Sequence, residues 1–201
     1  MLDAPFTAAQ FLKVGSYAVV LAGALLDNAR LFDQVRKLAI TDPLTGLSNY
    51  RTLFNVMETE VQRSRRTGRP FAVLLLDLDG LKAINDEHGH LVGSRAICRL
   101  ANVLRIHSRS VDTAARYGGD EFAVVLPEAG EEAAAAASRR ICERMARDGE
   151  FPQVTVSIGS AVFPKDGDTI DDLLGAADRA LYGMKRHPDG IRSLARIAAC
   201  L

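Results

Sequence analysis

Apolar residues in the first forty positions recur at alternating steps of three and four, from Ala18 to Ala39. This spacing forms a heptad seam and predicts one long helix over residues 7–39. Asn28 lies on the seam, where a polar residue can fix the register between two copies of the helix. The seam has two interpretations, pairing with a second copy or packing against the helix's own domain.

The rest of the chain alternates between helical and strand patterns. The run from Phe71 to Leu78 is almost wholly apolar, which predicts a central strand buried on both faces. Two strands flanking Gly118-Gly119 form a predicted hairpin. A hairpin within this order implies a mixed, largely antiparallel sheet with helices on its faces, an α+β fold. The expected helices after the first cover 49–67 (capped by Ser48 or Asn49), 81–87, 93–107, 131–147 and 169–185, and the expected strands cover 71–78, 111–116, 122–126, 154–162 and 191–197.

Composition and charge exclude several classes of protein. The 201 residues are 48% hydrophobic with zero formal charge, which suits one globular domain with an appended element and leaves no basic surface for nucleic acid. The three cysteines form no CxxC pair, which argues for a reducing compartment and against a zinc site. The longest apolar run, Val14 to Leu26, is shorter than the roughly 20 residues that span a bilayer. We therefore expect a cytoplasmic chain without a membrane segment.

Two acidic residues directly follow the glycine pair. The pair Gly118-Gly119 signals a hairpin because both residues can take positive φ without a steric clash. Asp120 and Glu121 are poor strand formers, and adjacent like charges do not stabilise a hairpin, so they require a compensating cation. If the hairpin pairs beside the central strand, Asp77 at that strand's end joins them at one edge of the sheet. Hard oxygen ligands of this kind suit Mg²⁺.

The segment after Asp77 can receive phosphate. Gly80 stands at a helix start, where free backbone N–H groups bind anions, and Lys82 adds a positive charge one turn in. The pattern thus predicts a site for a metal-bound polyphosphate. The simpler interpretation is that Asp77 and Asp79 only cap the helix, but the two acids of the hairpin favour the metal site.

Ordered motifs across the chain resemble one known family. The stretch Arg116–Phe122 reads Arg-Tyr-Gly-Gly-Asp-Glu-Phe and resembles the signature of the GGDEF family, the diguanylate cyclases. The resemblance covers roughly residues 38–190, and no Walker-type motif points to a rival nucleotide enzyme. Further matches to the family pattern, in order and spacing, are Asp42–Asn49, Asp77–Asp79, Lys82, Asn85–Asp86, Gly89–His90 and Ala177–Tyr182.

The resemblance implies a nucleotidyl-cyclase, polymerase-palm-like fold that joins two purine nucleoside triphosphates into a 3′,5′-linked cyclic dinucleotide and releases pyrophosphate. Each protomer of a homodimer holds one triphosphate. The resemblance also implies Mg²⁺ (or Mn²⁺) bound by Asp77, the Leu78 carbonyl and Asp120. It assigns catalysis to Asp120, Glu121 and Lys82, and triphosphate binding to Gly80, Leu81, Lys82 and Lys185.

The resemblance also divides the chain in two. Residues 41–201 resemble a GGDEF catalytic domain. Residues 1–40 form an N-terminal helix that resembles the end of a GAF sensory domain or a coiled-coil signalling linker. The chain is then expected to be the output end of a larger receptor.

One departure from the family pattern concerns base choice. The family usually reads Gly-His-x-x-Gly-Asp, and that Asp accepts hydrogen bonds from guanine, but here Ser94 replaces it while Asn85 is retained. A carboxylate matches the two donors of guanine and repels N1 of adenine, whereas a hydroxyl can donate or accept. Ser94 resembles the hybrid promiscuous GGDEF subgroup, which makes cyclic AMP-GMP, and implies use of both GTP and ATP. The alternative is an ordinary GTP-specific diguanylate cyclase.

Two further patterns concern regulation and the binding of phosphate. Arg109 and Asp112 form an RxxD pattern at the family's product-inhibition site for cyclic dinucleotide, with Arg140 as the contribution of a partner protomer. Asp189 stands where the family tends to place an arginine after Lys185.

Three functions are compatible with these motifs. The chain is a catalytic cyclase, a non-catalytic cyclic-dinucleotide receptor, or a dimerising output piece that is inert without its sensor. The intact acidic set favours the cyclase, because a receptor does not need it.

Overall fold

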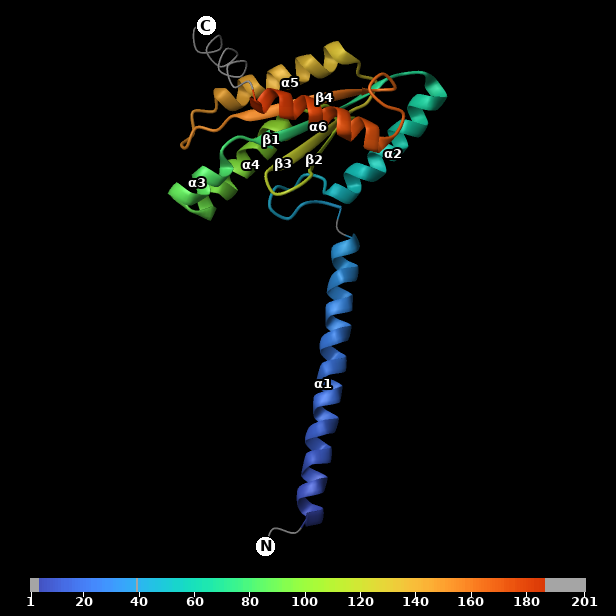
Figure 1. Ribbon diagram of the computed structural model, residues 1–201, viewed down its shortest axis with the longest axis vertical. Helices are drawn as coiled ribbons and strands as arrows, with labels where there is room; N and C mark the ends of the chain where they lie inside the picture. Colours follow the sequence, from blue (N-terminus) through green and yellow to red (C-terminus); the bar gives the residue numbers. More distant parts are fainter. Residues whose placement is uncertain (1–3, 39, 187–201) are drawn as a thin grey trace. The chain divides into compact units, whose positions relative to one another are not determined.

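The computed structural model describes residues 4–38 and 40–186, except for some side chains near both ends of the first helix and at residue 186 (Figure 1). The chain divides into two compact units, residues 1–39 and 40–201. The predicted edge strand 191–197 lies outside the described residues.

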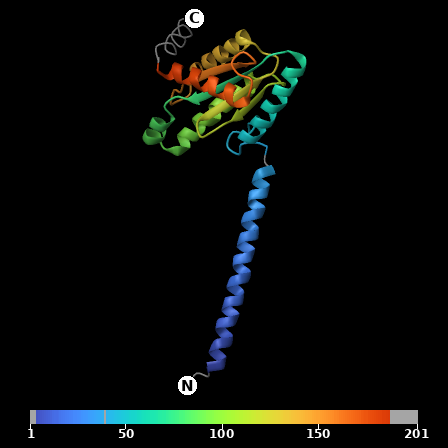
Figure 2. The same ribbon diagram turned by 45° about the vertical axis from the view of Figure 1, so that its right-hand side comes forward.

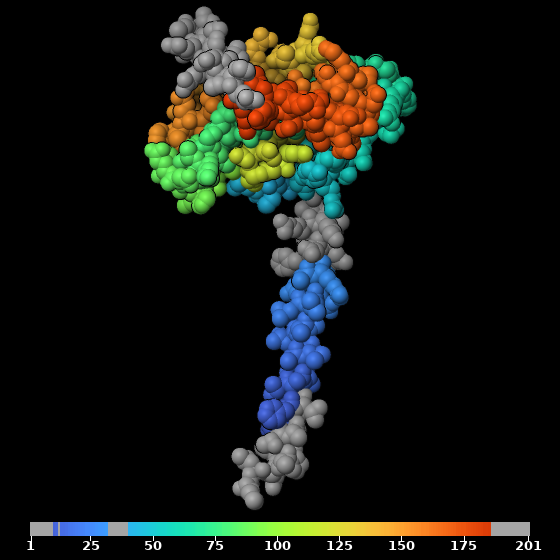
Figure 3. All heavy atoms as spheres, in the orientation of Figure 1, coloured from blue at the N-terminus to red at the C-terminus, as the bar shows by residue number. Residues whose placement is uncertain are grey.

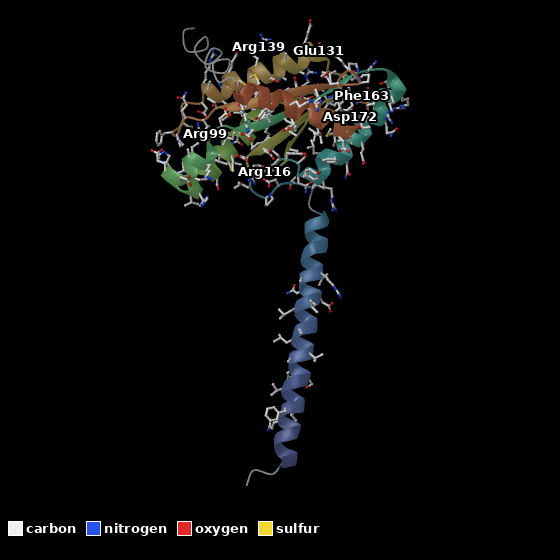
Figure 4. The ribbon with its side chains drawn as sticks, in the orientation of Figure 1. Arg99, Arg116, Glu131, Arg139, Phe163 and Asp172 are labelled. Atoms are coloured by element: carbon white, nitrogen blue, oxygen red, sulfur yellow. The ribbon has the colours of Figure 1, made fainter. Side chains whose placement is uncertain are left out.

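The first unit is a single helix, α1, which runs from Ala4 to Leu38 and begins three residues before the predicted start. A lone helix has no core of its own, so its apolar side chains stay uncovered within this unit (Figure 4). None of the helices in the described part of the chain has an apolar stretch long enough to cross a membrane. The exposed large apolar side chains of α1 are Phe11, Val14, Tyr17, Val19, Val20, Leu21, Leu25, Leu26 and Leu31.

The second unit is a sheet covered by helices on both faces (Figure 1). Its described residues form four strands in the order β2-β3-β1-β4, and every neighbouring pair is antiparallel. This arrangement confirms the predicted α+β fold with an antiparallel sheet. The elements are α2 (Tyr50–Thr67), β1 (Phe71–Leu78), α3 (Leu81–His88), α4 (His90–His107), β2 (Thr113–Arg116), β3 (Glu121–Leu126), α5 (Glu131–Ala146), β4 (Val156–Phe163) and α6 (Ile170–Arg186).

Helices lie on both sides of the sheet (Figure 2), and its central strand β1 is buried on both faces because it separates two apolar cores. Leu74 and Leu76 belong to the core that contains α4 and α5. Val73 and Leu75 point the other way, into the core that contains α2 and α6. Side chains alternate between the faces of a strand, so a continuous apolar run is what a strand covered on both faces requires.

The boundaries of several elements differ from the prediction. α4 begins at His90, not at Gly93, and α3 extends to His88. The gap of residues 88–92 left between the two predicted helices is therefore wrong: Gly89 alone, with φ 82°, ends one helix and precedes the next. Glycine adopts this φ at little steric cost, which permits so short a turn. At the start of α2, Asn49 is the cap, and its side chain accepts a hydrogen bond from the Thr52 backbone N–H at 2.9 Å.

Candidate active site

The pairing of β1 with β3 brings the acidic residues to one end of the sheet. Asp77 stands directly opposite Glu121 in the antiparallel register. The Leu78 backbone N–H donates to the Asp120 carbonyl at 3.2 Å, which extends the ladder to the hairpin. The hairpin is exposed on one face of the unit, between α3 and α6 (Figure 3).

The antiparallel pairing of β2 with β3 confirms the predicted hairpin. Its turn does not use the positive φ that glycine permits, because neither Gly118 nor Gly119 has one. Gly118 meets a different constraint, because a Cβ at that position would lie 2.5 Å from Oε2 of Glu121. The turn is closed by the Tyr117 and Gly118 backbone N–H groups, which both donate to the Glu121 carbonyl, at 2.8 and 3.1 Å.

Arg116 supports the outer end of the hairpin. Its guanidinium donates twice to the Gly119 carbonyl, from Nη2 at 2.6 Å and from Nε at 3.2 Å. Its Nη1 also forms an ion pair with Asp42, which precedes α2 (Figure 4). Asp42 in turn accepts from the backbone N–H and the hydroxyl of Thr45, at 2.8 and 2.7 Å. The position of Gly119 is thus held from outside the hairpin.

Asp79 has a structural role that neither sequence interpretation anticipated. It accepts hydrogen bonds from the hydroxyls of Thr155 and Ser157, each at 2.7 Å. α3 is preceded by Gly80, with φ 73°, and has no side-chain cap. The simpler interpretation, in which Asp77 and Asp79 cap this helix, is therefore wrong. Asp79 instead fixes the segment after β1 to the segment around the start of β4.

The pKa values of Asp77 and Glu121 are raised, chiefly by burial and also by neighbouring carboxylates. Burial raises the pKa of Asp77, and the charges of Asp120 and Asp79 add to the increase, while Lys185 opposes it. Burial likewise raises the pKa of Glu121, together with the charges of Asp77 and Asp120. This end of the sheet therefore carries more negative charge than the protein neutralises, which is the electrostatic setting of a cation site.

Lys185 is the basic residue that reaches this cluster. It lies in the last turn of α6, and its Nζ is 2.7 Å from Oδ2 of Asp77. The Asp77 side chain is 13% exposed and that of Lys185 is 41% exposed. The lysine that the family resemblance assigns to polyphosphate is thus bound to a predicted metal ligand.

The donor set suits Mg²⁺ better than a metal that needs a protein cage. No group of three or more His, Cys, Asp or Glu side chains among the described residues is arranged to hold a metal ion. Mg²⁺ is usually bound through only one or two carboxylates, with waters and substrate phosphates in its other positions. Asp77 and Asp120 interact electrostatically and are hard oxygen donors of this type. The residues present therefore fit Mg²⁺ delivered with a polyphosphate.

The two predicted base contacts lie on packed helices. Asn85 is in α3 and Ser94 is in α4. Gly93 allows the two helices to meet, because a Cβ there would lie 1.9 Å from Oδ1 of Asn85. The Asn85 amide is therefore placed against the backbone next to Ser94. Lys82 is exposed in the first turn of α3, whereas Leu81 is buried.

The predicted product-inhibition residues are also close in the structure. The Arg109 backbone N–H donates to Oδ2 of Asp112 at 2.8 Å, and the buried Oδ1 of Asp112 has no hydrogen-bond partner. Arg140 donates from Nη2 to the carbonyl of His107 at 2.9 Å, in the same chain. His107, two residues before Arg109, was not predicted, and its Nε2 is likewise buried without a partner.

A separate cavity of about 230 Å³ lies on the α6 side of the sheet. Tyr117, Glu121 and Asp178 contribute its polar groups, and leucine side chains of β1 and α6 line much of the rest. It borders the hairpin but includes neither Asn85 nor Ser94. The base contacts and this cavity are therefore different features of the unit.

Comparisons with known proteins agree with this geometry. A family profile described as "Diguanylate cyclase, GGDEF domain" matches residues 39–190. The bifunctional diguanylate cyclase/cyclic di-GMP phosphodiesterase MucR of Pseudomonas aeruginosa is 40% identical over 171 residues, which cover 83% of this chain and 24% of MucR. This chain belongs to the GGDEF domain family. It spans well under half of the length of the curated relatives it matches.

Solved structures of the family have the same fold. A sensory box/GGDEF family protein from Caulobacter crescentus is 36% identical, with a TM-score of 0.68, over 74% of this chain and 99% of that one. The coiled coil and GGDEF domain of DgcB from Caulobacter crescentus, solved in complex with c-di-GMP, is 29% identical. Its TM-score is 0.68, over 85% of this chain and 95% of that one.

Proposed function

We propose that this chain is a dinucleotide cyclase that condenses two purine nucleoside triphosphates into a cyclic dinucleotide and releases pyrophosphate. The observation that carries the proposal is the β1–β3 register, which places Asp77 opposite Glu121 and bonds Leu78 to Asp120. Family membership over residues 39–190 supports the same reaction class. The activity of MucR, a diguanylate cyclase in one of its two functions, is consistent with it.

Each residue of the site has a proposed task. Asp77, Asp120 and the Leu78 carbonyl hold Mg²⁺ or Mn²⁺, which when bound neutralises phosphate charge and activates the attacking 3′-oxygen. Asp120 accepts the proton of the attacking hydroxyl, and Glu121 supports it. The triphosphate is held by the backbone at Gly80 and Leu81 and by Lys82 and Lys185.

The base-binding pair sets the substrate. Asn85 and Ser94 face the purine, and Ser94 admits adenine as well as guanine, so the proposed products are cyclic AMP-GMP and cyclic di-GMP. The alternative is a GTP-specific diguanylate cyclase, which the family membership favours. Arg109 and Asp112 bind cyclic dinucleotide as an inhibitory site, with Arg140 contributing from a partner protomer.

The proposed active form is a homodimer, because each copy holds one triphosphate and the reaction joins two. The exposed apolar residues of α1 support pairing of two copies along the heptad seam, with residues 1–40 as a signalling helix or the end of a GAF-like domain. Residues 41–201 are then the catalytic domain.

The test is turnover by the purified chain. The protein is incubated with Mg²⁺ and equal concentrations of GTP and ATP, and the products are identified by mass spectrometry. We expect cyclic dinucleotide and pyrophosphate, with the rate reduced by at least about a hundredfold in Asp120→Asn. The exposed acid Glu132 in α5 provides a control, because Glu132→Gln should retain full activity. Binding of cyclic di-GMP without turnover would favour the receptor instead.

A further inference from the structure

The ion pair between Lys185 and Asp77 occupies the centre of the proposed metal site. Nζ of Lys185 lies 2.7 Å from a carboxylate that also interacts with the charges of Asp120 and Glu121. Among the ion pairs formed by the described residues, this is the pair that involves Asp77. The ammonium group is therefore the counter-cation of the acidic cluster in the ligand-free protein.

The arrangement conflicts with the two tasks proposed for these residues. An ammonium group that donates to Oδ2 of Asp77 competes with a metal ion for the same carboxylate, and two cations so close to each other repel. The proposed function also assigns Lys185 to the polyphosphate, so the same ammonium group has two anionic partners to serve. The ligand-free and ligand-bound sites must therefore differ at this lysine.

We propose that Lys185 is an exchangeable counter-cation: it neutralises Asp77 in the ligand-free protein and moves to the polyphosphate when a divalent cation binds Asp77. This inference rests on the proposed function. Lysine suits the task because its point charge is carried on a flexible four-carbon stem. Its place in the last turn of α6, with 41% of the side chain exposed, leaves room for the movement.

The exchange predicts cooperative binding of metal and nucleotide. A divalent cation that binds alone must displace Lys185, which then has no new partner. A divalent cation that arrives with a triphosphate supplies that partner. By thermodynamic linkage, each ligand then raises the affinity of the other by the same factor. In the absence of nucleotide, Lys185 therefore weakens the site for metal.

The experiment measures Mn²⁺ binding by isothermal titration without nucleotide. We expect Lys185→Met, which keeps most of the stem and removes the charge, to lower the Kd roughly three- to tenfold, because a partly exposed competitor is lost. Lys165→Met is the matched control. Like Lys185→Met, it removes one positive charge, but Lys165 follows β4 at the opposite end of the sheet and pairs there with Glu131. The Mn²⁺ Kd of Lys165→Met should therefore equal that of the wild type. An unchanged or higher Kd in Lys185→Met, or no Mn²⁺ binding by either the wild type or Lys185→Met, overturns the proposal.

The same titration with a non-hydrolysable GTP analogue tests the second half of the exchange. The analogue should lower the Mn²⁺ Kd of the wild type by a larger factor than that of Lys185→Met. Equal factors would show that the lysine does not move to phosphate, and would overturn this half.

A measurement on the wild type avoids dependence on any variant. The ammonium group of Lys185 is observed by ¹⁵N NMR while Mg²⁺ is added, and its signal should shift as it leaves Asp77. A signal that does not move contradicts the exchange. Turnover is measured separately: a chain that shows the shift but makes no cyclic dinucleotide refutes the proposed function and leaves the lysine exchange standing.

Discussion

Nη1 of Arg116 lies 3.3 Å from Oδ2 of Asp42, and the same guanidinium binds the Gly119 carbonyl. The ion pair is largely buried, with 18% of the arginine side chain and 16% of the aspartate side chain exposed. One arginine thereby connects the segment before α2 to the turn of the acidic hairpin. The segment before α2 is thereby tied to the turn that carries the acidic residues of the proposed metal site.

Loss of this ion pair should weaken both the fold and the reaction. Asp42→Asn keeps an oxygen for Thr45 but removes the charge that Arg116 faces. Hydrogen bonds to charged groups contribute about 1.5–3 kcal/mol, which corresponds to a Tm lower by about 3–12 °C. Turnover should fall as well, because the Asp42→Asn variant holds Gly119 less firmly. Asp27→Asn serves as control, since Asp27 pairs with Arg30 on the exposed surface of α1 and should leave Tm unchanged.

The same carboxylate predicts an acid-sensitive contribution to stability. Burial alone would raise the pKa of Asp42, but hydrogen bonds from Thr45 and the Arg116 charge outweigh it and hold the pKa below its ordinary value of 3.8. A lowered pKa stabilises the fold at any pH above the unfolded value, and the contribution disappears as pH falls through the folded value. The difference in free energy of unfolding between wild type and Asp42→Asn should be constant from pH 7 to about pH 5 and shrink below that. Urea unfolding at each pH measures it, and a difference that stays undiminished as the pH falls below the unfolded pKa would contradict the prediction.

The two glycines of the hairpin should respond differently to a methyl group. Neither needs glycine for its φ, and a Cβ at Gly119 would meet no protein atom within 4 Å. A glycine that the protein itself does not require points to close approach of a ligand. Gly119→Ala should therefore fold with wild-type Tm yet lose at least about tenfold in turnover. Gly118→Ala displaces only the flexible end of Glu121 and should lose less, so the reverse order would refute this explanation.

Base preference should follow the residue at position 94. In Ser94→Asp the carboxylate accepts from both donors of guanine and repels adenine N1. Because about 1.4 kcal/mol of binding free energy corresponds to a tenfold change in affinity, we expect the ratio of cyclic di-GMP to cyclic AMP-GMP to rise by about tenfold or more. Ser94→Ala removes the hydroxyl without adding a charge and should not produce this shift. The product ratio from equal GTP and ATP, measured by mass spectrometry, decides the matter. Exclusive cyclic di-GMP from the wild type would refute the promiscuous substrate choice.

Features set by local periodicity could be predicted from the sequence. The apolar run of β1 and a cap at the start of α2 follow from short-range rules, and the structure has both; of the two cap residues considered, Ser48 and Asn49, it is Asn49. The convergence of Asp77 with Asp120 and Glu121 depended on one further assumption, that the hairpin pairs beside β1, which the register confirms.

The remaining details depend on contacts between distant residues. Asp79 binds hydroxyls more than 70 positions away, and Lys185 pairs with Asp77 from the far end of the chain. No local pattern encodes either partner. The glycine pair indicated the hairpin but not its turn, because a Gly-Gly sequence permits positive φ without requiring it, and the crowding by Glu121 becomes visible only in three dimensions.

The place of β1 in the sheet has a consequence for control of the reaction. This strand has β3 on one side and β4 on the other, and helices cover both faces. Such a strand separates from its neighbours only when the whole domain unfolds, so slow hydrogen exchange of its amides should match global stability. The acidic end of the strand is therefore preformed in each copy. In the proposed homodimer, an upstream signal would then have little to reshape within one domain, and control would fall to how often, and in what orientation, two preformed half-sites meet.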